Sequence, residues 1–144
     1  MPHPVKLKKK VVNEIRKHAE SSLSSEVAGL LLGSIHKDSL LVSDVVTGEQ
    51  VSSRTHVSLQ DKFLVRVAFE YGRRGKKKSV VGWYHSHPEL GCFVSQIDFE
   101  TQKRFQALFP DAVGLIVDPS LPEKLEVFRI DDDKVEQITD YTVS

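Results

Sequence analysis

Residues 85–98 of this 144-residue chain are His-Ser-His-Pro-Glu-Leu-Gly-Cys-Phe-Val-Ser-Gln-Ile-Asp. The residues before them, Ser-Val-Val-Gly-Trp-Tyr at positions 79–84, are β-branched, aromatic and apolar, and they predict a buried strand. Side chains alternate between the two faces of a strand, so His85 and His87 point to one side and Ser86 to the other. Two imidazole nitrogens can therefore reach the same metal ion.

A helix is predicted soon after this strand. Pro88 removes a backbone donor and ends the strand pairing, and the residues around Gly91 are typical of a turn. Ser95 is expected to be the N-cap, because Ser95 and Asp98 have the spacing of a capping box with aspartate in place of glutamate. Apolar residues then recur at helical spacing until Pro110 ends the pattern; they are Ile97, Phe105, Leu108 and Phe109.

Asp98 lies in the first turn of this predicted helix, facing back toward the strand end. A folded-back loop would bring its carboxylate beside His85 and His87, giving two nitrogens and one oxygen with one coordination position open. That is the form of a catalytic zinc site, whereas structural zinc sites are closed. The ordinary alternative is two packed histidines and a simple helix cap. The metal interpretation is favoured because strand end, turn and helix start converge on one point.

Glu26 is a second carboxylate of interest. It opens the apolar segment Glu-Val-Ala-Gly-Leu-Leu-Leu-Gly at residues 26–33, which predicts a buried strand. Its ordinary explanation is a solvated residue that ends the preceding loop. A carboxylate at this position can also act as the base that a hydrolytic metal site needs.

Together these residues resemble the JAMM (MPN+) family of zinc isopeptidases. The family pattern is a glutamate on an early strand, then His, Ser or Thr, His, seven residues, Ser, two residues and Asp. Glu26, His85, His87, Ser95 and Asp98 fill it. Within the family, residues 82–102 and the sequence Ala-Val-Gly-Leu-Ile-Val-Asp-Pro at 112–119 most resemble the deubiquitinases of the proteasome lid. The likeness covers roughly residues 20–130.

The resemblance implies an α/β, cytidine-deaminase-like JAMM/MPN fold, with a curved mixed central sheet flanked by helices, in a single catalytic domain over residues 1–144. It implies that one Zn²⁺ is held by His85, His87 and Asp98. Glu26 would hold the reacting water and exchange its protons, and Ser95 would donate to the oxyanion. The implied enzyme is a hydrolase of the metalloprotease class. It would cleave the isopeptide bond between ubiquitin, or a ubiquitin-like modifier, and a substrate lysine.

Two other functions remain open. One is a non-catalytic MPN scaffold or binding module, against which the complete ligand set argues. The other is a zinc hydrolase of a different amide, such as a sulfur-carrier protein or a small peptide. The resemblance also makes ubiquitin or ubiquitin-like conjugates the expected partners, and leaves open whether the enzyme associates with a proteasome. The insertion after Pro119 is short and the chain stops at Ser144. These features favour a compact, archaeal-type enzyme that acts alone.

The composition agrees with a soluble protein of one core. Hydrophobic residues make up 40% of the chain, and 20 basic residues balance 20 acidic ones, so nucleic acid is not an expected partner. No apolar run is long enough to span a membrane and no signal peptide is recognised, which favours a cytoplasmic location. The basic residues at 73–78 predict a solvated loop, with a docking patch for a partner as the alternative.

Cys92 is the only cysteine, which excludes an internal disulfide and a cysteine-rich zinc site. A cysteine protease built on Cys92 is an alternative, but the nearby histidines are better explained as metal ligands. A packed loop thiol is expected instead. The remaining histidines are predicted to be structural or surface residues; they are His3, His18, His36 and His56.

Elsewhere the periodicity predicts two further helices and several strands. Leu7, Val11, Val12, Ile15 and Ala19 recur at helical spacing, with Lys6 to Lys10 on the solvent side, and residues 58–71 predict a second helix. Strands are expected at 28–35, 40–46, 79–86, 112–117, 124–130 and 135–139, with a turn at 131–133. The family resemblance places a mobile insertion loop at 47–57.

Overall fold

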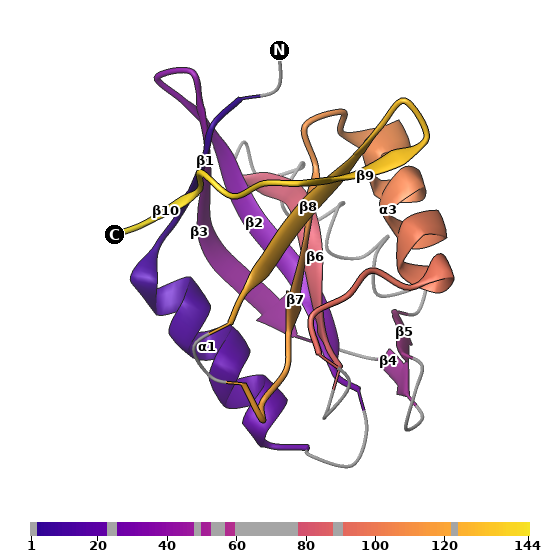
Figure 1. Cartoon of the computed structure of the whole chain (residues 1–144). Coiled ribbons are helices and arrows are strands. Elements are labelled where there is room, and N and C mark those ends of the chain that lie inside the picture. Colours follow the sequence, from indigo (N-terminus) through magenta and orange to yellow (C-terminus); the bar gives the residue numbers. More distant parts are fainter. Residues whose placement is uncertain are drawn as a thin grey trace.

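The computed structural model describes residues 3–22, 26–47, 50–52, 57–59, 78–87, 91–121 and 124–144. An eight-stranded curled sheet lies between helix α1 (Lys9–Glu20) and helix α3 (Gln96–Leu108), in the order β10-β1-β3-β2-β6-β7-β8-β9 (Figure 1). The strands of this sheet are β1 (Val5–Leu7), β2 (Ala28–His36), β3 (Ser39–Thr47), β6 (Ser79–Ser86), β7 (Val113–Val117), β8 (Glu126–Asp131), β9 (Lys134–Gln137) and β10 (Thr142–Val143). A separate hairpin joins β4 (Gln50–Ser52) to β5 (Val57–Leu59).

Strand β6 lies near the middle of the sheet and determines where functional residues meet. It pairs antiparallel with β2, so that His85 lies opposite Ala28, and parallel with β7, so that His85 lies opposite Ile116. The end of β6, the end of β7 and the start of β2 therefore share one edge of the sheet. Loops leaving that edge can bring residues from distant parts of the sequence together.

Each face of the sheet has its own apolar cluster, because alternate residues point to opposite sides. Leu31 and Tyr84 pack on the α1 side, together with the buried face of α1. Leu30 and Trp83 pack on the other side, where Phe105 of α3 joins them. The observed architecture is the mixed α/β sheet flanked by helices that the sequence predicted.

The six strands and the turn expected from the sequence are confirmed, with ends that agree within two residues. The N-terminal helix is only partly confirmed. It begins at Lys9, whereas Lys6 and Leu7 belong to β1. Leu7 pairs in parallel with Val42 of β3 and Val143 of β10. These are long-range contacts, and they override the local helical spacing that placed Leu7 in the helix.

The predicted helix over residues 58–71 is wrong at its start, because Ser58 and Leu59 pair with β4 in the hairpin. The rest of that range lies outside the described residues. So does the basic cluster at 73–78, apart from Lys78, which forms an ion pair with Asp44. The expected insertion loop contains β4 and the start of β5. Within the described part of the chain, no helix is both long and apolar enough to cross a membrane.

Helix α3 has the expected bounds but buries different residues from those its apolar spacing suggests. Ile97 is 50% exposed and Leu108 is 88% exposed. The buried residues of α3 are both polar, Asp98 and Gln102. They lie one turn apart on the face toward β6 and β7. A helix that buries polar residues needs partners for them, and these partners define the site.

Candidate metal centre

Three side chains converge at the shared edge of the sheet. Nε2 of His85 lies 2.8 Å from Nε2 of His87 and 2.8 Å from Oδ1 of Asp98. Nε2 of His87 lies 3.2 Å from Oδ2 of Asp98. All three residues are buried. The sequence predicted this convergence from spacing, and within the described residues it is the group of three that could hold a metal ion.

The two histidines face the same way because they are two residues apart at the end of β6. Ser86 points to the opposite side, where its hydroxyl oxygen accepts a hydrogen bond from the backbone N–H of Val27 at 2.9 Å. The backbone N–H of His87 donates to the carbonyl of Val117 at 2.8 Å. The end of β6 is thus tied on one side to the start of β2 and on the other to the end of β7.

Asp98 is held in place by the helix N-cap. The side chain of Ser95 accepts a hydrogen bond from the backbone N–H of Asp98 at 3.2 Å. In return, Oδ2 of Asp98 accepts one from the backbone N–H of Ser95 at 2.9 Å. The predicted capping box with aspartate is therefore confirmed. Because the cap fixes one carboxylate oxygen, the other is aimed at His85.

Burial and mutual contacts shift the pKa values of the three residues. Burial lowers the pKa of His85, although Asp98 acts in the opposite direction. Burial also acts to lower the pKa of His87, but the hydrogen bond to Asp98 and the charges of Asp98 and Glu26 together outweigh it, so the pKa is raised. Burial would raise the pKa of Asp98, yet the hydrogen bonds to His85 and His87 hold it well below its usual range. Asp98 is therefore ionised and His85 neutral near pH 7, the protonation states that bind a cation, whereas His87 must give up any proton on Nε2 when a cation binds.

The donor set fits a zinc ion. Two imidazole nitrogens and one carboxylate oxygen are the protein ligands of many catalytic zinc sites, and here the three ligand atoms all lie within 4.8 Å of one another. Nδ1 of His85 and Nδ1 of His87 are buried, with no hydrogen-bond partner among the residues described. A proton on each Nδ1 leaves the Nε2 lone pairs free for a cation.

Glu26 lies just before β2 at the same edge and is only 4% exposed. Burial raises its pKa to about 7, with His87 lowering it and Asp98 raising it. The Glu26 carboxyl group therefore interacts electrostatically with two members of the His-His-Asp group. The alternative of a solvated loop residue is therefore wrong for Glu26.

Cys92 and Asp118 belong to the loops around the site. Burial raises the pKa of the Cys92 thiol, which opposes a nucleophilic role. Oδ2 of Asp118 accepts a hydrogen bond from the backbone N–H of Gly91, whose φ of 80° is one that glycine favours. Oδ1 of Asp118 accepts from the backbone and the hydroxyl of Ser120. Asp118 thus joins the loop before α3 to the turn after β7.

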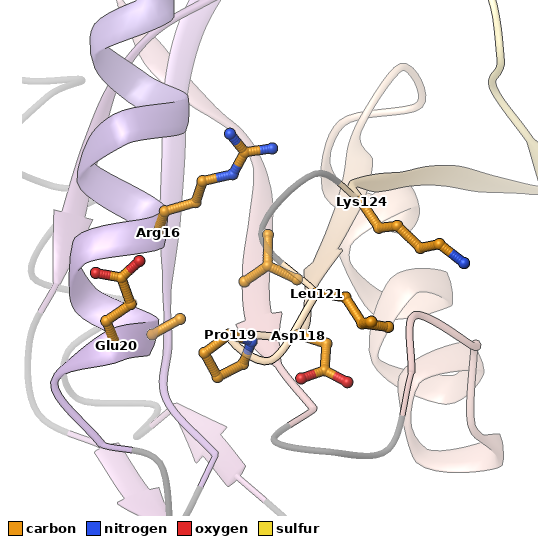
Figure 2. Close-up of a pocket in the computed structure, with 8 residues that line it drawn as sticks. Arg16, Glu20, Asp118, Pro119, Leu121 and Lys124 are labelled. Atoms are coloured by element: carbon orange, nitrogen blue, oxygen red, sulfur yellow. The ribbon is translucent and has the colours of Figure 1, made fainter.

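A shallow pocket lies beside this turn, between the end of α1 and the segment after β7 (Figure 2). Arg16 and Glu20 line it from α1, and Pro119 and Leu121 face them. It contains no member of the His-His-Asp group. Its charges are mixed, so it does not define a second candidate site.

Two residues beside the candidate ligands were not singled out from the sequence. Trp83 precedes His85 by two positions on β6, and its indole N–H donates to Oε1 of Gln102 at 2.8 Å. Gln102 follows Asp98 by four positions on α3. That spacing places Gln102 on the same helix face as Asp98. In the sequence, this spacing was the one indication that Gln102 lies near the candidate ligands.

The fold and the site together define a class: an α/β domain with a candidate metal-binding group where a central strand meets a capped helix. Residues 2–111 match the family described as "JAB1/Mov34/MPN/PAD-1 ubiquitin protease". The chain belongs to this family, which confirms the resemblance found in the sequence.

The relatives with similar sequences include a ubiquitin hydrolase and a proteasome subunit. "Ubiquitin carboxyl-terminal hydrolase RPN11" of Saccharomyces cerevisiae is 36% identical over 122 residues, which cover 81% of this chain and 40% of that protein. "26S proteasome non-ATPase regulatory subunit 14" of Drosophila melanogaster is 38% identical over 120 residues, which cover 79% of this chain and 39% of that protein. The matched region thus spans about two-fifths of these relatives.

A solved structure supports the fold over almost the whole chain. The solution structure of protein DSY2949 from Desulfitobacterium hafniense superposes with a TM-score of 0.74 at 26% identity. The match covers 97% of this chain and 92% of that one. The α/β JAMM/MPN fold predicted from the sequence is therefore confirmed.

Proposed function

We propose that this chain is a zinc-dependent isopeptidase that cleaves ubiquitin, or a ubiquitin-like modifier, from a lysine side chain. The observation that carries the proposal is the convergence of His85, His87 and Asp98, with atoms 2.8 to 3.2 Å apart, in a buried site that also influences Glu26. Family membership supplies the reaction class. We also propose that residues 1–144 form a single catalytic domain.

His85, His87 and Asp98 would hold the zinc ion. When bound, zinc supplies a Lewis acid that polarises a carbonyl oxygen and lowers the pKa of water to roughly 7. The protein contributes a carboxylate fixed by its own helix cap and two imidazoles fixed by strand pairing. Because these ligands are already in place, less ordering is needed when the ion binds.

Glu26 would move the protons of the reaction. Amide hydrolysis requires a base that takes a proton from water and an acid that returns it to the departing amine. A buried carboxyl group with a pKa of about 7 can do both near neutral pH, since neither protonation state is strongly disfavoured. The products would be the free carboxyl terminus of the modifier and the free lysine amine.

Ser95 would stabilise the negative charge that develops on the scissile carbonyl oxygen. Its hydroxyl oxygen already accepts from the backbone N–H of Asp98, so its hydrogen remains available for donation. The side chain is partly exposed beside the buried group, where a substrate can reach it. Ser95 thus has a structural task in the cap and a proposed catalytic one.

The substrate class rests on the relatives. The Saccharomyces cerevisiae relative is named as a ubiquitin carboxyl-terminal hydrolase, and the Drosophila melanogaster relative is named as a proteasome regulatory subunit. We therefore extend the proposal to ubiquitin-like conjugates as substrates, to the proteasome as a partner and to the cytoplasm as the location.

The test is cleavage of lysine-linked di-ubiquitin and of ubiquitin-like conjugates by protein of known zinc content, with Glu26→Gln as the matched variant. We expect one zinc per chain in both proteins, with cleavage by the wild type and a loss of about 10² to 10⁴-fold in the variant. Wild-type protein that binds one zinc yet cleaves no conjugate would contradict the isopeptidase. Equal activity of Glu26→Gln would contradict the role of Glu26.

A further inference from the structure

The candidate ligands come from the end of β6 and from α3. One buried contact joins these two elements next to the ligands. Trp83 shares a face of β6 with His85, and Gln102 shares a face of α3 with Asp98. The indole Nε1–H of Trp83 donates to Oε1 of Gln102 at 2.8 Å. Each partner of this hydrogen bond is thus the neighbour of a ligand on its own element.

Trp83 also contacts a ligand directly. Its ring is stacked on the imidazole of His85, with centroids 4.6 Å apart and planes 6° from parallel. Phe105 and Phe128 hold the indole, at centroid distances of 6.0 and 6.5 Å. The plane of the His85 ring therefore follows the plane of the indole, which cannot tilt without breaking its hydrogen bond to Gln102.

The orientation of the Gln102 side chain is fixed by three partners. Gln102 is 0% exposed, and its Nε2 donates to the carbonyl of Ala112 and to Oε1 of Gln106, both at 2.8 Å. A flipped amide would place a donor against the indole N–H and an acceptor against the Ala112 carbonyl. One orientation is therefore strongly preferred.

We propose that Trp83 and Gln102 are positioning residues for the metal centre. They set the spacing between β6 and α3 and the plane of the His85 ring, so that the two histidines and Asp98 meet at one point. This inference rests on the proposed function, because it requires that the group binds a metal. Partners behind metal ligands typically contribute about 10 to 100-fold in metal affinity.

Gln106 provides a matched control one turn further along α3. It is the same residue type, and its side chain also makes partly buried hydrogen bonds, with the backbone N–H and carbonyl of Ile130 in β8. It touches neither β6 nor a ligand in those bonds. Its Oε1 also accepts from Nε2 of Gln102, so Gln106→Met removes one of the three partners of Gln102 but leaves the bonds to Trp83 and Ala112 in place. Replacing Gln102 or Gln106 by methionine keeps a similar volume and removes the amide, so both changes perturb stability through the same mechanism.

The experiment titrates the metal-depleted full chain with Co²⁺, followed by its visible absorption, and measures unfolding by denaturant in parallel. We expect one Co²⁺ per wild-type chain. Gln102→Met should weaken Co²⁺ binding about 10 to 100-fold and shift the absorption bands, because the ligand geometry changes. Gln106→Met should also lose stability, yet keep the wild-type bands and an affinity within about threefold, because Trp83 and Ala112 still hold Gln102. Trp83→Phe keeps an aromatic ring without the N–H and should weaken binding about 10-fold.

The outcomes separate the two proposals. Absence of Co²⁺ and Zn²⁺ binding by wild-type protein would overturn the metal centre, and the positioning role with it. Wild-type affinity and bands in Trp83→Phe and Gln102→Met would overturn the positioning role alone. Equal losses in Gln102→Met and Gln106→Met, with wild-type affinity in Trp83→Phe, would also overturn it, because the bond between Trp83 and Gln102 would then have no part in metal binding. If Gln102→Met does not fold, the comparison of Trp83→Phe with Gln106→Met decides.

Discussion

The two faces of β6 differ in what they bury. On the α1 side, Tyr84 packs among aliphatic residues and makes one polar contact, from its hydroxyl to Nδ1 of His18 at 2.8 Å. On the α3 side, Trp83, His85 and His87 meet the polar residues of α3. One face buries almost only apolar area, whereas the other buries titratable groups and amides in contact with one another.

This difference shows how one strand can serve stability and chemistry together. Burial of apolar surface stabilises the fold, whatever the exact geometry, at about 25 cal/mol per Å². Burial of charged and polar groups is costly unless each has a partner, so it enforces one geometry and shifts pKa values. On the α3 face those shifts leave Asp98 ionised and raise the pKa of Glu26 to about 7.

Removing a ligand from the α3 face of β6 should have the largest effect. Asp98→Asn keeps the size of the side chain and an oxygen for the helix cap, but removes the charge. We expect zinc binding to be lost and cleavage of ubiquitin conjugates to fall about 10³-fold or more, since the metal contributes several kcal/mol. Zinc content and cleavage rate measure this. A variant that retains both would show that Asp98 is not a ligand of the catalytic zinc.

The next largest effect is expected at Ser95, where both roles meet. Ser95→Ala removes the cap, at a cost of about 1 kcal/mol in stability, and the hydroxyl donor, at a cost of about 3 kcal/mol in the barrier. Ser95→Gly should recover most of the stability but none of the activity, because glycine is a tolerable N-cap. Rates that follow stability across the two variants would contradict the oxyanion role.

A smaller effect is expected on the α1 face. Tyr84→Phe removes the hydrogen bond to His18 and should lower the free energy of unfolding by about 1 kcal/mol. Zinc affinity and cleavage rate should stay at wild-type values, since Tyr84 points away from the ligands. Denaturant unfolding and a zinc titration measure the two quantities. A fall of more than about threefold in zinc affinity would show that the two faces are not independent.

The smallest expected effect is a pH dependence of stability that arises at His18, the partner of Tyr84. Burial lowers the pKa of His18, so the folded state resists its protonation. The stability contribution is present above the unfolded pKa of about 6.5 and is lost as the pH falls toward the folded pKa. In metal-depleted protein, the wild type should therefore lose more stability than His18→Gln between pH 7.5 and 5.5. Parallel pH profiles of the two proteins would contradict this assignment.

The sequence predicted most of the α3 face because its signals are local. The alternation of His85 and His87 follows from the strand, and the position of Asp98 follows from the capping box. The positioning pair was missed because the contact between Trp83 and Gln102 joins two elements, and no local pattern predicts it. The exposure of Ile97 has the same origin, since tertiary packing decides which helix face is buried.

The N-terminal region was predicted less well for a related reason. Leu7 fits helical spacing with Val11, but it is placed by parallel pairing with β3 and β10, two elements distant in sequence. Such pairing depends on the whole sheet, whereas periodicity describes one segment at a time.

The most direct test of the central claim is a titration of metal-depleted protein with zinc while the initial rate of di-ubiquitin cleavage, or of cleavage of a ubiquitin-like conjugate, is followed. If His85, His87 and Asp98 hold one catalytic zinc, the rate should rise from near zero in proportion to added zinc and level off at one equivalent per chain. A cleavage rate that does not depend on zinc would contradict the account. So would protein that is fully occupied by zinc and cleaves none of the conjugates.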